Sequence, residues 1–323
     1  MNIKQRYFNY LRNTAAKVDP YVKSFLERHF TLYPPARNML LTKYRFGKPQ
    51  LRPAIIRLAY ELIGGKNWEN IIPACATIEV LETAYYCLDD FFDQEPPEKQ
   101  NRDSLILQGV GFYSIAHGMI CDVNQYVSKK TFSRILNELF NLDLNTLQAG
   151  IIDSTMYGTD EQYYMKKVVG YNFWEQALKI GGLLAEHKDN DIELLGAIGL
   201  NLGKAHVIAN DCWDFGKELE DFRMGKSTLP IIFALENTTG NESSTLKVFL
   251  GKKNLSDYEI HCVRRIIVRC GAIIHGKQEA LKLCASAIKL LKQFPDSEAK
   301  QLIEFSTTYT QRNKYYSLLE QYK

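Results

Sequence analysis

The sequence predicts an all-α protein that forms one large helical domain. Only ten prolines and twenty glycines interrupt its 323 residues. In the long segments between them, apolar residues recur at the i, i+3, i+4 and i+7 positions of buried helix faces, and the alternation typical of strands is scarce. No linker separates two halves of different composition, so we expect a single helical bundle over residues 1–323.

The predicted helices follow the breaks in the chain. Residues 71–88 are apolar almost all round, which predicts a central and buried helix. Clusters of proline, glycine and small polar residues mark the breaks at 33–35, 95–97, 158–160 and 237–241. Further helices are expected over residues 104–126, 129–156, 160–186, 190–218, 255–270, 275–293 and 296–321.

Composition and charge exclude several classes of protein. Basic residues exceed acidic ones by only three (40 against 37), too few for a protein that binds nucleic acid or anionic lipid through a basic surface. No apolar stretch reaches the roughly 20 residues of a membrane span, and the first residues do not resemble a signal peptide. The seven cysteines contain no C-x-x-C pair. We therefore expect a cytoplasmic protein without an integral membrane segment.

An acidic cluster ends the predicted central helix. Asp89, Asp90 and Asp93 share one side of a helical turn, since positions i and i+4 lie about 40° apart. No lysine or arginine lies between Lys66 and Lys99. Three neighbouring carboxylates without a cation favour a hard divalent ion with oxygen ligands. The alternative is a solvated helix end.

A second cluster repeats this spacing at the end of another apolar helix. Asn210, Asp211 and Asp214 again occupy positions i, i+1 and i+4, and Glu218 follows one turn later. Two such clusters can face each other across a bundle and hold metal ions between them. Mg²⁺ usually keeps part of its coordination shell for phosphate oxygens. The pair of clusters therefore predicts Mg²⁺ and a diphosphate ligand.

Four motifs together resemble those of the trans-isoprenyl diphosphate synthases, the polyprenyl synthetases of the class I terpenoid synthase fold. They are Gly-Lys-Pro-Gln-Leu-Arg-Pro at 47–53, the acidic cluster at 89–93, the segment 202–214 that ends in the second cluster, and Gly-Lys-Ser-Thr-Leu-Pro at 225–230. The resemblance implies a bundle around a deep apolar cavity, a homodimer, and about three Mg²⁺ ions with the substrate diphosphate. The implied catalytic and metal-binding residues are Asp89, Asp90, Asp93, Asn210, Asp211, Asp214 and Glu218.

The resemblance also implies two substrates. Arg52, with help from Lys48 and Arg57, would bind isopentenyl diphosphate, while Lys226 and Lys204 would bind an allylic prenyl diphosphate. The allylic substrate would ionise and be condensed with isopentenyl diphosphate. Product length in the family follows side-chain bulk before the first acidic motif.

The tyrosine pair before the first acidic motif predicts a short product. Tyr85, four residues before Asp89, would close the cavity and limit the product to 15–20 carbons. Tyr86 points about 100° away along the helix and is expected to pack in the core.

Several positions depart from the family pattern. Glu82 stands where typical members carry a histidine or glutamine that helps bind isopentenyl diphosphate, and a carboxylate there would repel this substrate. The basic segment around Lys48 contains one extra residue. Arg102 is the nearest guanidinium to the missing arginine pair, and residues 171–172 replace the usual Lys-Thr pair of the middle helix.

These departures keep two other functions open. Asn210, Asp214 and Glu218 have the i, i+4, i+8 spacing of the second metal motif of terpene cyclases. A cyclase would be expected to carry a diphosphate-sensing arginine within 160–186, and this segment contains none. The other alternative is a non-catalytic partner subunit, which the nearly intact acidic clusters argue against.

Overall fold

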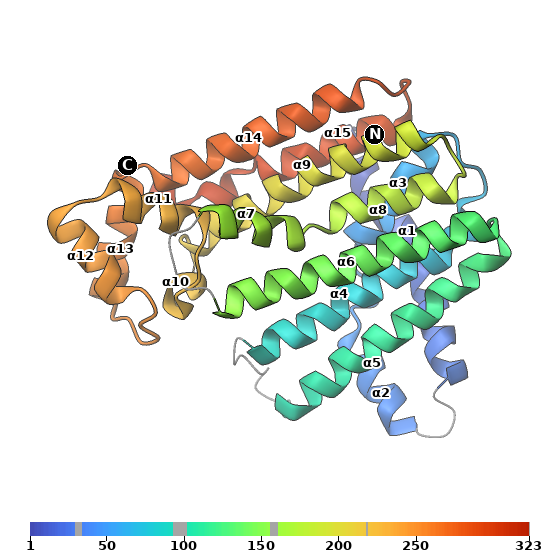
Figure 1. The fold of residues 1–323 in the computed structure, drawn as a ribbon, viewed down its shortest axis with the longest axis horizontal. Helices are drawn as coiled ribbons and strands as arrows, with labels where there is room; N and C mark the ends of the chain where they lie inside the picture. The colour runs from blue at the N-terminus through green and yellow to red at the C-terminus, as the bar shows by residue number, and fades with distance from the viewer. Residues whose placement is uncertain (30–33, 93–101, 156–160, 218, 323) are drawn as a thin grey trace. The chain divides into compact units, whose positions relative to one another are not determined.

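Every regular element that the structure describes is a helix, as the sequence predicts. The computed structural model describes residues 1–29, 34–92, 102–155, 161–217 and 219–322 (Figure 1). The α-helices and short 3₁₀ helices in chain order are α1 (Ile3–His29), α2 (Pro34–Lys43), α3 (Leu51–Leu62), η1 (Trp68–Ile71), α4 (Ile72–Phe92), α5 (Arg102–Cys121), η2 (Asp122–Gln125), α6 (Lys129–Thr155), α7 (Glu161–Gly170), α8 (Phe173–Leu184), α9 (Asp189–Asp214), α10 (Glu220–Met224), α11 (Leu229–Asn237), α12 (Gly240–Phe249), α13 (Asp257–Arg269), α14 (Ala272–Leu291), α15 (Glu298–Thr310), η3 (Asn313–Tyr316) and α16 (Leu318–Gln321).

The chain divides into two compact units that interleave along the sequence. Unit 1 contains Met1–Leu139, Gln176–Gly196 and Phe294–Phe305, and unit 2 contains Phe140–Glu175, Ala197–Gln293 and Ser306–Lys323. Four of the boundaries fall inside helices α6, α8, α9 and α15. A boundary inside a helix carries no linker composition, which explains why the sequence shows none. The single domain therefore stays a prediction.

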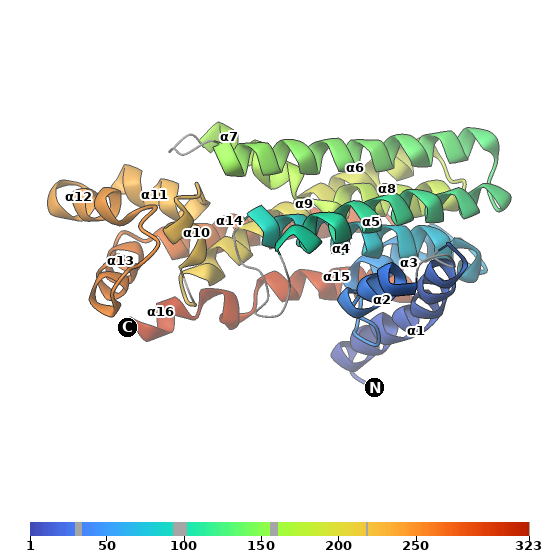
Figure 2. The ribbon, with the colours of Figure 1, turned by 90° about the horizontal axis from the view of Figure 1, so that it is seen from below.

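Unit 1 is built around α4, the helix predicted to be central. Its buried side includes Ala74, Ile78, Leu81 and Ala84, each with 1% of its surface exposed or less. Helix α5 lies beside α4 in both views of the chain (Figures 1 and 2). Gly109 of α5 permits this approach, because a Cβ atom there would come within 2.9 Å of a Leu88 side chain. The first acidic cluster thus lies at the end of a helix whose preceding turns are tightly packed in the core.

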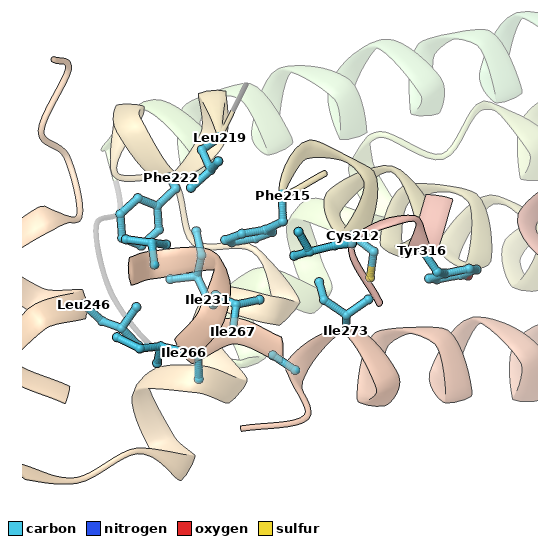
Figure 3. Close-up of a cluster of buried hydrophobic side chains, with 14 of the residues drawn as sticks. Cys212, Phe215, Leu219, Phe222, Ile231, Leu246, Ile266, Ile267, Ile273 and Tyr316 are labelled. Carbon is cyan, nitrogen blue, oxygen red and sulfur yellow. The ribbon is translucent and has the colours of Figure 1, made fainter. Parts of the chain in front are cut away.

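Unit 2 has its own core around the last turns of α9. Cys212 in the last turn of α9 and Phe215 just after it pack against Phe222, Ile267 and other apolar side chains (Figure 3). These side chains come from α10, α11, α13, α14 and the C-terminal segment. The glycine of α14 at position 276 is required here, since a Cβ atom would lie 2.5 Å from the Cys212 sulfur. This packing fixes the helix end on which the second acidic cluster stands.

The segment predicted as one helix over 160–186 is two helices. Asn172 separates α7 from α8, and its Oδ1 accepts a hydrogen bond from the Trp174 backbone N–H at 3.0 Å, which caps α8. Its Nδ2 donates to the Leu200 carbonyl at 3.2 Å. A Cβ atom at Gly203 would lie only 1.6 Å from the Asn172 Oδ1. Asn172 is therefore a structural residue that joins α8 to α9.

Three helical stretches are long and apolar enough to cross a membrane, judged by length and composition alone: Trp68–Phe92, Asp103–Gln125 and Asp189–Asp214. Between 44% and 67% of the most apolar window of each is buried inside the protein. The expectation that no stretch reaches this length and hydropathy is therefore wrong for these three.

Candidate active site

The first acidic cluster lies at the C-terminal end of α4. Asp89 is exposed, and Asp90 forms an ion pair with Lys43 of α2 at 3.0 Å between Nζ and Oδ2. Asp93 lies outside the described residues. The sequence shows no neighbouring cation for this cluster, because its cation comes from 47 residues upstream.

The basic segment before α3 is held by an aspartate of α1. Asp19 accepts two hydrogen bonds of 2.7 Å, one from the Gly47 backbone N–H and one from Gln50 Nε2. Gly47 has φ +71°, a left-handed conformation that glycine adopts without strain. Lys48 is exposed, and Arg52 begins the first turn of α3. These contacts fix the position of the backbone that carries Lys48 and Arg52.

Arg52 and Glu82 form an ion pair between α3 and α4. The Glu82 side chain is 8% exposed and that of Arg52 is 26% exposed. Tyr86, one turn further along α4, lies against two guanidiniums, 5.4 Å from that of Arg45 and 5.9 Å from that of Arg52. Tyr86 is 41% exposed, so the prediction that it packs in the core is wrong.

The remaining predicted residues of unit 1 are Arg57, Tyr85 and Arg102. Arg57 donates to Glu61 and Thr14 and covers the Trp68 ring at 4.0 Å, so it belongs to a structural network. Tyr85 is partly buried on α4. The side chain of Arg102 lies outside the described residues.

The second acidic cluster lies at the end of α9 and is largely buried. Asp211 is 7% exposed and accepts a 3.0 Å hydrogen bond from the Tyr164 hydroxyl. Asp214 Oδ1 accepts the Glu220 backbone N–H at 2.9 Å, whereas its Oδ2 is buried without a hydrogen-bond partner. Asn210 is exposed. Glu218 lies outside the described residues.

Two lysines stand among these acids. Lys167 of α7, 5% exposed, donates to Asp153 Oδ1 at 2.9 Å and to the Ser227 carbonyl at 3.2 Å. Lys226 lies 3.4 Å from Asp153 and 3.6 Å from Asp221. Burial alone would lower the pKa of Lys167, but Asp153 and Asp211 together raise it.

Sequence reasoning assigned no role to Lys167, because it placed the middle-helix motif on residues 171–172. The available signal was that Lys167 directly precedes the apolar pair Val168 and Val169. Lys204, which was predicted, is partly buried on α9.

Among the described residues, more carboxyl than ammonium groups lie around the second cluster. Five carboxyl groups (Asp153, Asp211, Asp214, Glu220 and Asp221) stand near two ammonium groups (Lys167 and Lys226). Burial first, and Asp221 in addition, raises the pKa of Asp211 and of Asp214 to about 7. Excess buried carboxylate and an unpartnered Asp214 oxygen suit a hard divalent cation. Within the described ranges, no group of three His, Cys, Asp or Glu residues is already arranged to hold one.

Comparison with known proteins identifies the family. The polyprenyl synthetase family model matches residues 38–267. The geranylgeranyl diphosphate synthase of Sulfolobus acidocaldarius is 26% identical over 93% of this chain and 98% of its own, and the short chain isoprenyl diphosphate synthase of Methanocaldococcus jannaschii is 22% identical over 77% and 80%. Among solved structures, geranylgeranyl pyrophosphate synthetase from Pyrococcus horikoshii superposes with a TM-score of 0.83 at 20% identity, covering 96% of this chain and 99% of its own.

A second solved structure, polyprenyl synthase from Caulobacter crescentus complexed with calcium and isoprenyl diphosphate, superposes with a TM-score of 0.80 at 19% identity over 98% of both chains. The two structures confirm the isoprenoid synthase fold. The family match covers well over half of the chain and confirms the class of enzyme that its motifs predict. The protein is a member of the polyprenyl synthetase family.

Proposed function

We propose that the protein is a Mg²⁺-dependent prenyltransferase. It ionises an allylic prenyl diphosphate and condenses it with isopentenyl diphosphate to a prenyl diphosphate of 15–20 carbons. The observation that carries this proposal is the desolvated pair Asp211 and Asp214, in which Asp214 Oδ2 is buried without a hydrogen-bond partner, in a chain of the polyprenyl synthetase family. The named relatives are prenyl diphosphate synthases.

In this proposal the acids of each cluster would hold metal ions. The ligands would be Asp89, Asp90 and Asp93 in the first cluster and Asp211 and Asp214 in the second, and bound ions would supply Lewis-acid chemistry to the donor diphosphate. Asn210 and Glu218 complete the second set. Carboxylates that repel one another without a cation gain most from binding one, which is the reason to assign them this role.

The chain's own cations bind and orient the donor diphosphate. Lys226 stands at the edge of the second cluster, and Lys204 and Arg102 would add positive charge. Lys167 is buried beside Asp153 and compensates the charge of that carboxylate, which would otherwise repel the donor diphosphate. The C–O bond of the donor breaks and its electron pair leaves with the diphosphate. The allylic cation is then attacked by the double bond of isopentenyl diphosphate at Arg52 and Lys48.

The condensation ends when the new carbon skeleton loses a proton to the departed diphosphate. No side-chain base is required, and an apolar wall excludes water from the cation. Product length would be limited by Tyr85 on α4. The relatives include geranylgeranyl, geranylfarnesyl and nonaprenyl diphosphate synthases, so family membership leaves the length open.

A terpene cyclase is the second candidate, because the Arg52–Glu82 ion pair weakens the case for isopentenyl diphosphate. The deciding experiment incubates the purified protein with Mg²⁺ and geranyl or farnesyl diphosphate, with and without isopentenyl diphosphate. Chain extension supports the proposal. A cyclic hydrocarbon in both reactions supports the cyclase, and no turnover supports a non-catalytic subunit.

We further propose a cytoplasmic homodimer. Helix α6 exposes Phe140, Leu144, Leu147 and Ile151 at i, i+4, i+7 and i+11, with 39–62% of each exposed. An exposed apolar stripe of this kind is typical of an interface between copies. Sedimentation of the wild type should give twice the mass of a Phe140→Glu, Leu147→Glu variant, and equal masses would exclude this interface.

A further inference from the structure

The ion pair of Arg52 with Glu82 changes what Arg52 can do. Glu82 is 6% exposed, so its carboxylate has little access to water and depends on Arg52 for compensation. The Glu82 carboxylate therefore acts mainly by occupying the Arg52 guanidinium, and not only by repelling a diphosphate from a distance. A diphosphate that binds Arg52 must take the place of this carboxylate.

The surroundings of Arg52 leave it little freedom to serve both anions. Its Nη2 lies 3.5 Å from the Tyr86 hydroxyl, and its guanidinium lies 5.9 Å from the Tyr86 ring. The Asp19 contacts to Gly47 and Gln50 fix the chain just before it. Arg52 is thus held in the orientation that faces Glu82.

Displacing Glu82 from Arg52 would also leave a buried carboxylate without a compensating positive charge. Glu79, one turn earlier on α4, lies close enough that Arg52 lowers its pKa, while burial raises that pKa by more. Two carboxyl groups therefore share the positive charge of Arg52, and an incoming diphosphate would leave both without it. Removing one partner of a buried ion pair is costly for this reason.

We infer that Glu82 is a specificity-determining residue that competes with the acceptor diphosphate for Arg52. This inference rests on the proposed function, in which Arg52 binds isopentenyl diphosphate. Glu82 keeps the acceptor subsite weak and leaves the donor subsite, which depends on the acidic clusters, unaffected. The enzyme would then require a high concentration of its acceptor but an ordinary concentration of its donor.

The test replaces the carboxylate by an amide of the same shape. Glu82→Gln should lower the KM for isopentenyl diphosphate at least about tenfold, which corresponds to about 1.4 kcal/mol, and leave the KM for the allylic donor unchanged. Calorimetry with isopentenyl diphosphate in chelator should show a matching fall in Kd. Glu69→Gln removes the same charge from an exposed residue paired with Lys17, and it should change neither constant.

A second comparison separates direct competition from a general change of charge. In an Arg52→Ala background, Glu82→Gln should no longer improve the KM or the Kd. An improvement that persists without Arg52, or an unchanged KM in normally extending Glu82→Gln enzyme, would overturn the inference and leave the prenyltransferase standing. If wild type and Glu82→Gln both ionise the donor but never extend it, the proposed function fails and the inference with it.

Discussion

The two acidic clusters share one spacing and differ in almost everything around it. At the end of α4, Asp89 is exposed and Asp90 forms a partly buried ion pair with Lys43. At the end of α9, Asp211 and Asp214 are buried among further acids and two lysines, and burial raises the pKa of both carboxyls. The same i, i+1, i+4 pattern therefore occurs in a partly exposed setting at the end of α4 and in a desolvated one at the end of α9.

The difference shows what a spacing can and cannot predict. The spacing follows from helix geometry, so it places the carboxylates of each cluster on one side of a helix. Their burial and their partners depend on other elements, which bring Lys43 to Asp90 of the first cluster and Lys167 close to Asp211 of the second. We expect the second cluster to affect the unfolding free energy of the metal-free protein more than the first does. We expect both clusters to be needed for turnover.

The largest expected effect comes from removing one acid of each cluster. Asp89→Ala and Asp211→Ala should each lower kcat at least about a hundredfold, since losing roughly 3 kcal/mol of transition-state stabilisation has that effect. Circular dichroism should show both variants folded, with Asp89→Ala indistinguishable from wild type in stability because this residue is exposed. Near-normal turnover in either variant would show that its cluster holds no essential ion.

The next effect tests the buried cation of the second cluster. Lys167→Ala removes the close partner of Asp153 and leaves buried carboxylates with Lys226 alone, so unfolding free energy should fall by about 3 kcal/mol. Urea denaturation measures this. Lys166→Ala is the matched control, because the neighbouring lysine is exposed and lies over the Tyr163 ring. Equal losses in the two variants would contradict the structural role of Lys167.

Much of the fold could be predicted because the apolar periodicity of a helix is contained in a short stretch of sequence. Apolar periodicity identified α4 and α9, and both end at their acidic clusters. The break between α7 and α8 was missed because it depends on Asn172 bonding to α9, a contact between residues 28 positions apart. The sequence does not show where the two units meet, because four of the boundaries lie inside continuous helices.

The helix positions of the candidate carboxylates could be predicted, and the cations that pair with them could not. Motif spacing alone placed the carboxylates Asp89, Asp211 and Asp214 on helix ends. The structural role of Arg57 and the pairing of Glu82 with Arg52 depend on which helices pack together, and a sequence pattern does not contain that information. The burial of Lys167 next to the exposed Lys166 depends on which side of α7 packs against the rest of unit 2.

The pH dependence of stability is a smaller expected effect, and it distinguishes the two clusters. The pKa of Asp211 and of Asp214 rises from 3.8 to about 7 on folding, so the folded protein holds protons that the unfolded chain releases above about pH 4. Unfolding free energy should therefore fall as pH rises through this window, on the order of 2 kcal/mol between about pH 5 and pH 8 in chelator.

Asp214→Asn should reduce that pH dependence, and Asp90→Asn should not. Mg²⁺ added at about pH 8 should restore stability to the wild type, since it binds the folded state. Denaturation curves that fall equally with pH in all three proteins would show that the second cluster is not the source.

The smallest effect on stability concerns the two tyrosines that precede the first cluster. Tyr85 lies one turn before Asp89 on the same helix face, so a chain anchored at the metal site and growing along α4 would meet its ring. Tyr85→Ala should lengthen the product by at least one five-carbon unit, read by chromatography. Tyr86 is 41% exposed against Arg45 and Arg52, so Tyr86→Ala should cost less than about 1 kcal/mol and leave product length unchanged. A longer product from Tyr86→Ala alone would place the limit to chain growth on the other face of α4.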